Sequence, residues 1–282
     1  MRSIISVFFF LSSCLYLKGQ QVNEYPFHVS KTGNGDQSVL LLPGFACSGD
    51  VWSETVESLR KNYTCYTLTM AGFAGTAPKA GASFKNWEKG IVQFIRDNHI
   101  SKPIIIGHSM GGGLAMAIAS DYPDLPEKII IVDALPCIAA LTNNDFKSND
   151  TNNCSGLIRH ITGMTDDQFQ QMQNTAAASL TTNKNMQEVI AGWSVKSDRE
   201  TFAAMYCDFS NTDLRDNISR IKCPALVLLE SYFINFTTVI EEQYKNLKKA
   251  DLRYATKGLH FIMYDDTEWY IAQIRDFLNA AE

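Results

Sequence analysis

Two short segments contain residues whose types and spacing could carry out acyl transfer. Residues 107–111 read G-H-S-M-G, a Gly-x-Ser-x-Gly pattern centred on Ser109, and residues 258–261 read G-L-H-F around His260. A serine hydroxyl is a poor nucleophile until a neighbouring imidazole takes its proton, which an imidazole can do near neutral pH. We therefore predict Ser109 as the nucleophile, and His260 is a candidate for the general base.

The surroundings of Ser109 favour a catalytic serine over an ordinary glycine-rich turn. The apolar run 103–107 precedes it and the helical pattern 111–122 follows it, so the serine falls on a strand-to-helix turn. On such a turn the side chain projects above the sheet, and glycines flank it because larger residues would collide with neighbouring backbone. The turn also directs the first helical amides beside Ser109, so the Met110 N–H can stabilise developing negative charge.

Short apolar runs alternate with amphipathic segments through most of the chain, which is the pattern of parallel strands connected by helices. From about 135 to 221 the pattern is helical only, and it predicts a helical insertion over the sheet, with a separate helical domain as the alternative. We predict an α/β fold with a doubly wound sheet formed by 25–134 and 222–282. The predicted strands are 39–42, 63–70, 103–107, 128–132, 225–229 and 252–255, and the predicted helices are 51–61, 84–99, 111–122, 239–248 and 268–278.

In these features the chain after residue 25 resembles the α/β-hydrolase superfamily, including its order of nucleophile first and histidine last. The resemblance implies a mostly parallel sheet with a helical cap, 135–221, inserted between two strands. Residues 39–45, V-L-L-L-P-G-F, resemble the strand and oxyanion loop of the family, which implies that the Phe45 N–H is an oxyanion donor beside that of Met110. Pro43 stands where the family usually has histidine, but a backbone donor survives that change.

The third member of the triad is where the sequence departs from the family pattern. Most relatives place an aspartate a few residues after the strand at 225–229, and Phe233 occupies that position here. An acid is needed to fix the tautomer of the histidine and to stabilise its charged form. Asp133, at the end of the preceding strand, is the predicted acid. The alternatives are Glu230, Asp208, Asp213, or a dyad that works without an acid.

Apolar residues near these motifs predict an apolar cleft, with Trp52, Trp193 and Phe261 as candidate pocket residues and core packing as the alternative for each. No arginine or lysine is tied to a motif, so no clamp for a carboxylate or phosphate is expected. The other histidines are expected to be structural or exposed: His108 beside the nucleophile, His28 on an early strand, and His99 and His160.

The first residues of the chain have the layout of a signal peptide. One positive charge is followed by an apolar segment that is too short for a typical bilayer span, and Gly19 offers a small residue for cleavage. We predict a signal peptide at 1–19 and export to the periplasm or medium. The alternative is a lipid anchor at Cys14, because L-S-S-C resembles a lipobox. No membrane span is expected in the mature chain.

Without Cys14, six cysteines remain, an even number that permits disulfides in an exported protein, and Cys137 with Cys154 is a plausible local pair. No cysteine or histidine cluster has the spacing of a zinc site, so neither a metal nor a cofactor is expected. The formal net charge of −5 argues against non-specific nucleic-acid binding, which needs clustered Lys and Arg.

The sequence therefore predicts a serine hydrolase that acts on an ester, thioester or related acyl bond of a small, largely apolar substrate. Two alternatives remain open. Relatives on this scaffold also hydrolyse peptides as aminopeptidases, although no acidic site for a substrate amine is identifiable. The phenylalanine at the expected acid position motivates the other alternative, a ligand-binding protein without catalytic activity.

Overall fold

Seven strands form one sheet in the order β1-β3-β2-β4-β5-β6-β7. The computed structural model describes residues 25–280, so the predicted signal peptide 1–19 and Cys14 lie outside the described residues. The sheet is parallel except for β1, which pairs antiparallel with β3 and contains His28. The strands are β1 Phe27–Thr32, β2 Gln37–Leu42, β3 Tyr63–Met70, β4 Ile104–His108, β5 Lys128–Val132, β6 Ala225–Leu229 and β7 Ala250–Tyr254.

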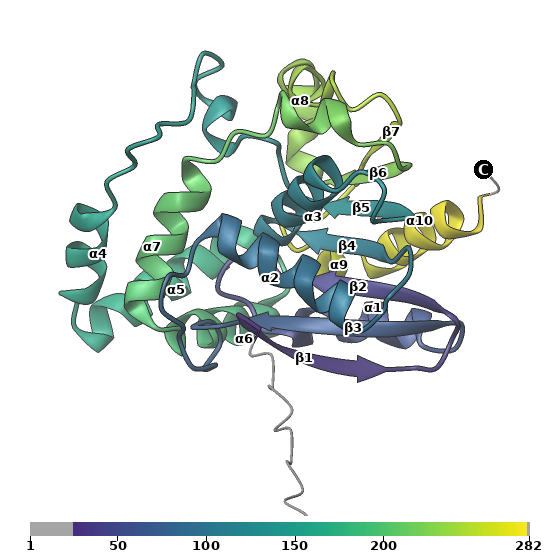
Figure 1. Cartoon of the computed structure of the whole chain (residues 1–282). Coiled ribbons are helices and arrows are strands. Elements are labelled where there is room, and N and C mark those ends of the chain that lie inside the picture. The colour runs from purple at the N-terminus through teal and green to yellow at the C-terminus, as the bar shows by residue number, and fades with distance from the viewer. Residues whose placement is uncertain (1–24, 281–282) are drawn as a thin grey trace, which may run out of the picture.

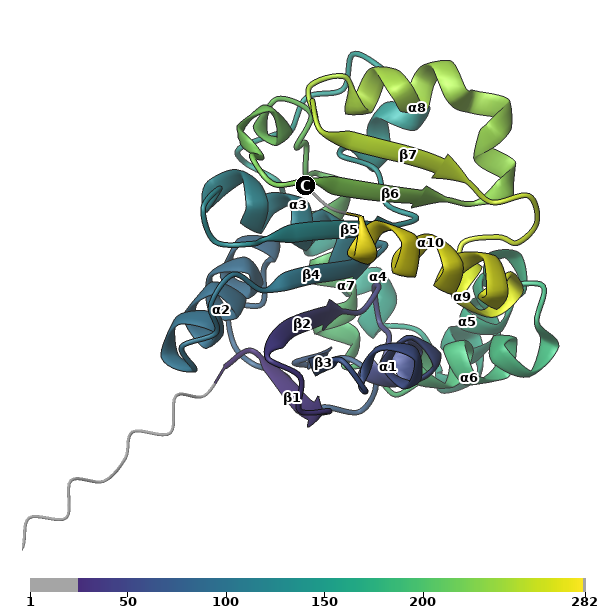
Figure 2. The same ribbon diagram turned by 90° about the vertical axis from the view of Figure 1, so that its right-hand side faces the viewer.

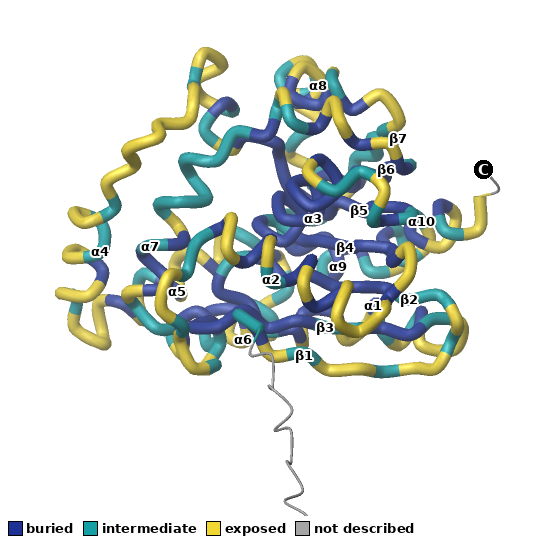
Figure 3. Tube along the Cα trace, viewed as in Figure 1, coloured by how far each residue is buried: buried dark blue, intermediate teal, exposed yellow. Residues whose placement is uncertain are grey.

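Helices cover both faces of the sheet (Figures 1 and 2), as expected when parallel strands are connected by crossover helices. Helices α2, α3 and α8 pack on one face and α1, α9 and α10 on the other. The central strands between them are buried, as the tube in Figure 3 shows. These helices are α1 Ser53–Leu59, α2 Phe84–Asp97, α3 Met110–Asp121, α8 Thr237–Tyr244, α9 Ile262–Asp265 and α10 Thr267–Asn279, with 3-10 turns at Gly49–Trp52, Ile138–Leu141, Asn217–Arg220 and Ser231–Phe236.

A helical cap is inserted between β5 and β6, and it lies on one side of the sheet in Figure 1. Helices α5, α6 and α7 of the cap begin with side-chain caps: Thr165 and Gln168 form a capping box, and Asn183 and Asp198 each accept a backbone N–H of the first turn. The predicted α/β fold with a helical insertion is thereby confirmed. The cap helices are α4 Ser155–Thr162, α5 Asp166–Leu180, α6 Lys184–Val195 and α7 Arg199–Ser210.

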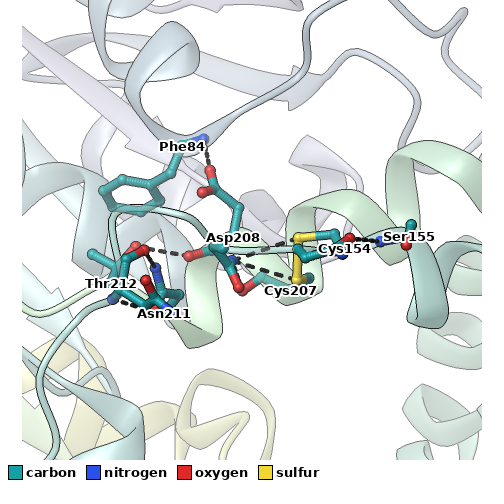
Figure 4. The surroundings of a disulfide bond; sticks show 10 residues. Phe84, Cys154, Ser155, Cys207, Asp208, Asn211 and Thr212 are labelled. Atoms are coloured by element: carbon teal, nitrogen blue, oxygen red, sulfur yellow. Dashed lines mark hydrogen bonds between the residues drawn. A yellow bond between two sulfur atoms is a disulfide. The ribbon is translucent and has the colours of Figure 1, made fainter.

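The cysteine pairing differs from the prediction. Cys154, at the start of α4, forms a disulfide with Cys207 in α7, and their Cα atoms are 5.7 Å apart (Figure 4). Cys137 is a buried free thiol instead. The prediction of a Cys137–Cys154 pair was wrong because it used distance along the chain. Cys154 and Cys207 are 53 residues apart in the sequence and meet because α4 packs against α7.

Within residues 25–280, no helix combines the length and the apolar character that crossing a bilayer requires.

The disulfide can be tested by peptide mapping. Protein alkylated under denaturing conditions and digested without reduction should yield one linked peptide pair that contains Cys154 and Cys207. The buried thiols Cys47, Cys65 and Cys137 should carry the alkyl label. A linked peptide that joins Cys137 to Cys154 would contradict the structure, and a digest made after reduction serves as the control.

Candidate active site

Ser109 lies on a sharp turn between β4 and α3, where its backbone adopts φ 53° and ψ −121°. A non-glycine residue in this region is strained, and such strain is found at functional sites. A Cβ atom at Gly107 would lie 2.1 Å from the carbonyl oxygen of Gly111, and a Cβ at Gly111 would lie 2.1 Å from that of Leu42. Both glycines are therefore required for the turn that exposes the serine side chain.

Asp133 directly follows β5 and contacts the ring of His260. Its Oδ2 accepts a hydrogen bond from the His260 Nδ1 at 2.6 Å, and its Oδ1 accepts one from the backbone N–H of Glu230 at 2.7 Å. The Asp133 side chain is 1% exposed and that of His260 is 23% exposed. The structure thus brings the predicted base and the predicted acid together, and His260 lines the same cavity as Ser109.

The charge of Asp133 prepares His260 to accept a proton. Burial disfavours the charged ring, but the hydrogen bond and charge of Asp133, with a contribution from Glu230, outweigh burial and raise the pKa of His260 above its usual value. The imidazolium formed during catalysis is therefore stabilised where it arises.

The alternative acids have other partners. The backbone N–H of Glu230 holds Asp133, while burial and the nearby Asp133 raise the pKa of the Glu230 carboxyl to about 7. The Asp208 carboxylate accepts the backbone N–H of Phe84 at 2.7 Å (Figure 4), and Asp213 forms an ion pair with Arg215. Of these carboxylates only Asp133 is hydrogen-bonded to His260.

Ser109 and His260 line the same cavity, although no hydrogen bond joins their side chains within residues 25–280. They are linked through His108, whose Nε2 donates to the carbonyl oxygen of His260 at 3.0 Å. Burial and the nearby His260 hold the pKa of His108 well below its usual range, so this ring is neutral. His108 therefore anchors the histidine loop, in keeping with its predicted structural role. Catalytic hydrogen bonds are often long in unliganded enzymes and shorten when substrate binds.

Of the predicted oxyanion donors, Phe45 lines the cavity with Ser109, and Met110 directly follows Ser109 at the start of α3. In the described part of the chain, neither the Phe45 N–H nor the Met110 N–H donates a hydrogen bond to another protein group. The loop is tightly packed, because a Cβ at Gly44 would lie 2.7 Å from the Nδ1 of His108. Two backbone amides without a protein acceptor, beside a serine hydroxyl, are suited to binding an oxyanion.

The cavity above Ser109 has a volume of about 490 Å³ and lies between the sheet and the cap. Its wall is mainly apolar, and among the described residues that line it there is no Asp, Glu, Lys or Arg. This size is in the range of small-molecule sites, roughly 300–1,000 Å³.

Two of the predicted pocket residues do not reach this wall. Phe261 lines the cavity, but Trp52 is fully buried in the core between the sheet and α1, and Trp193 packs against the edge of the same core. The prediction was wrong for both tryptophans because closeness in sequence to a motif does not show which way a side chain points. The cap residues that do line the cavity include His160, which is exposed at its rim, and Gln173.

Comparison with known proteins agrees with this architecture. A sequence profile for the alpha/beta hydrolase fold matches residues 37–154. Over 254 residues the chain is 21% identical to a pimeloyl-(acyl-carrier protein) methyl ester esterase from Aliivibrio fischeri, covering 88% of this chain and 96% of that one. An esterase structure from Exiguobacterium antarcticum matches with a TM-score of 0.75 at 17% identity, covering 92% of this chain and 97% of that one.

The chain has the α/β-hydrolase fold. A shorter match, 29% identical over 104 residues, is to the dihydrolipoyllysine-residue acetyltransferase component of the acetoin cleaving system from Cupriavidus necator. It covers 36% of this chain and 28% of that one, so the chain spans less than a third of that relative.

Asp265 connects the histidine loop to the cap, a role that no sequence motif indicated. Its Oδ2 accepts the backbone N–H of Leu259 at 2.9 Å. Its Oδ1 accepts the Thr181 hydroxyl at 2.6 Å and the Thr182 backbone N–H at 3.0 Å, both at the corner between α5 and α6. Partial burial raises the pKa of Asp265, but the hydrogen bonds to its carboxylate outweigh burial and lower the pKa below its usual value. The carboxylate therefore fixes the loop beside His260 against the cap.

Replacing the acid gives a direct test of its assignment. The variant Asp133→Asn should fold and should lose kcat by on the order of 10⁴-fold, because the His260 tautomer and its charged form lose their support. Its acid limb in the pH profile should move to lower pH, since His260 must be neutral to act and Asp133 raises the pKa of His260. Steady-state kinetics across pH measure both effects.

Glu230→Gln is the matched control. It should retain most of its activity and show a smaller shift of the acid limb in the same direction, because Glu230 contributes less to the raised pKa of His260. If this variant alone were inactive while folded, the assignment of Asp133 would be wrong.

Proposed function

We propose that the protein is a serine hydrolase that cleaves an ester, thioester or related acyl bond of a small, largely apolar substrate through an acyl-enzyme. The observation that carries the proposal is the 2.6 Å contact between Asp133 and His260 at an apolar cavity that also contains Ser109. The esterases among the similar proteins, from Aliivibrio fischeri and Exiguobacterium antarcticum, support the reaction class.

The residues perform the reaction in two halves. His260 takes the proton of the Ser109 hydroxyl as its oxygen attacks the substrate carbonyl, and the N–H groups of Phe45 and Met110 bind the resulting oxyanion. When the tetrahedral intermediate collapses, His260 gives the proton to the leaving alcohol or thiol. A water molecule, deprotonated by the same ring, then attacks the acyl-enzyme and releases the acid.

The apolar wall accounts for the expected substrate class. A cavity wall without Asp, Glu, Lys or Arg offers no permanently charged partner for an ionised carboxylate, phosphate or amine, and burying an unpaired charge is costly. An aminopeptidase requires an anionic partner for the substrate amine, and the cavity wall as described contains no acidic side chain.

Covalent labelling tests the nucleophile and the reaction class together. A fluorophosphonate should add its mass to Ser109 in the wild-type protein and leave Ser109→Ala unlabelled. Short-chain p-nitrophenyl esters should be hydrolysed by the wild type and not by this variant. No labelling of folded protein would favour a binding protein instead, and turnover of aminoacyl p-nitroanilides alone would favour a peptidase.

We also propose that the protein is exported. The Cys154–Cys207 disulfide supports this location, because disulfides persist mainly in oxidising compartments. Protein expressed in a bacterium should be recovered outside the cytoplasm, with an intact mass that lacks the predicted signal peptide 1–19. A mass showing lipid on Cys14 would instead indicate a membrane-anchored form, and a cytoplasmic chain that retains Met1 would contradict export.

A further inference from the structure

Helix α5 presents one polar residue within its buried face. Its buried residues are Phe169, Gln173 and Ala177, spaced four apart so that they follow one side of the helix. Phe169 is fully buried and Ala177 is 2% exposed, as expected for an apolar stripe. Gln173 between them is 5% exposed, so an amide with two donors and two acceptor lone pairs is placed where apolar packing is expected.

Among residues 25–280, the Gln173 amide forms no hydrogen bond with another protein group. Its nitrogen and oxygen atoms are nevertheless not fully enclosed by the protein. Gln173 lines the cavity above Ser109, so its amide is open to that space. An amide that opens into a cavity without a protein partner is free to bind water or a group of the substrate. Ser194 of α6, which is 9% exposed, is a second neutral polar residue on the same wall.

The position of Gln173 along α5 indicates which part of a substrate it meets. The C-terminal end of α5 contacts the histidine loop, where the Leu180 carbonyl accepts the Phe261 N–H at 3.1 Å. Gln173 lies seven residues before Leu180, about 10 Å along the helix axis. One turn beyond it, Phe169 packs on Phe202.

Phe202 in turn packs on Phe45 of the oxyanion loop. Because His260 protonates the leaving group, the leaving group lies beside the histidine loop and the acyl chain extends away from it. Gln173 therefore lies on the acyl side of the cavity.

We propose that Gln173 binds an uncharged hydrogen-bonding group within the acyl chain of the substrate. The substrate class is then an ester or thioester of an acid whose apolar chain carries a ketone, hydroxyl or amide at a distance from the scissile bond. This inference rests on the proposed serine hydrolase function and adds a substrate requirement to it. The amide is neutral, and the described residues of the wall include no Asp, Glu, Lys or Arg, so the position selects a neutral group over an ionised one.

Matched substrates test this requirement. The probes are p-nitrophenyl octanoate and its isomers in which a ketone replaces one methylene at successive chain positions. The wild type should prefer one ketone isomer over octanoate in kcat/KM. Gln173→Met, which keeps the length of the side chain and removes the amide, should lower kcat/KM for that isomer by about 10-fold, mainly through KM, as loss of one neutral hydrogen bond predicts.

The same variant should hydrolyse octanoate at least as well as the wild type, and its melting temperature should be unchanged or higher, because no protein hydrogen bond is lost. Gln170→Met, at an exposed position on the same helix, is the control and should leave kcat/KM unchanged for both substrates.

If the wild type hydrolysed octanoate and every ketone isomer with the same kcat/KM, the inference would be overturned while the hydrolase function stayed intact. A fall in melting temperature with equal losses on both substrates would also overturn it, since Gln173 would then be structural. If the wild type hydrolysed no ester at all, the proposed function itself would fail, and the inference with it.

Discussion

The hydrogen bond between His260 and Asp133 depends on parallel strands being held in one register. Val132 and Leu228 are paired across β5 and β6. Just beyond the strands, the Ser109 N–H donates to the Val132 carbonyl and the Asp133 N–H to the Leu228 carbonyl, at 2.8 and 2.7 Å. The sheet ladder thus continues into the site. A shift of one residue would turn each strand's side chains to the opposite face, so the core fixes the positions of nucleophile and acid together.

Sequence reasoning could locate the strand-to-helix turn that carries Ser109 because the constraint on this turn is local. The glycines at 107 and 111 are needed for a turn whose close contacts lie within a few residues or on the adjacent strand. The acid was harder to predict, since Asp133 and Glu230 both follow strands that end at the same edge of the sheet. The choice between them depends on side-chain direction: the backbone of Asp133 has φ 46°, and its carboxylate receives the Glu230 N–H. No sequence pattern expresses that direction.

The cap was predictable as helical but not in its internal arrangement. Periodicity indicates helices, yet the packing of α4 on α7 that joins Cys154 to Cys207 is a tertiary property. The same holds for the cavity wall. Trp52 and Trp193 were chosen as apolar residues near the motifs or in the insertion. Gln173 was overlooked because it lies in a segment with many polar residues, where one more glutamine does not indicate a cavity. The four-residue spacing from Phe169 to Ala177 was the one available signal that Gln173 faces inward.

The cap and the histidine loop are joined at one carboxylate. Asp265 accepts hydrogen bonds from Leu259, next to the base, and from Thr181 and Thr182 of the cap. Any displacement of the α5–α6 corner is therefore transmitted to the backbone beside His260. If that corner moved while a ligand entered or left the cavity, the hydrogen bond from Leu259 to Asp265 would couple the movement to the position of the imidazole.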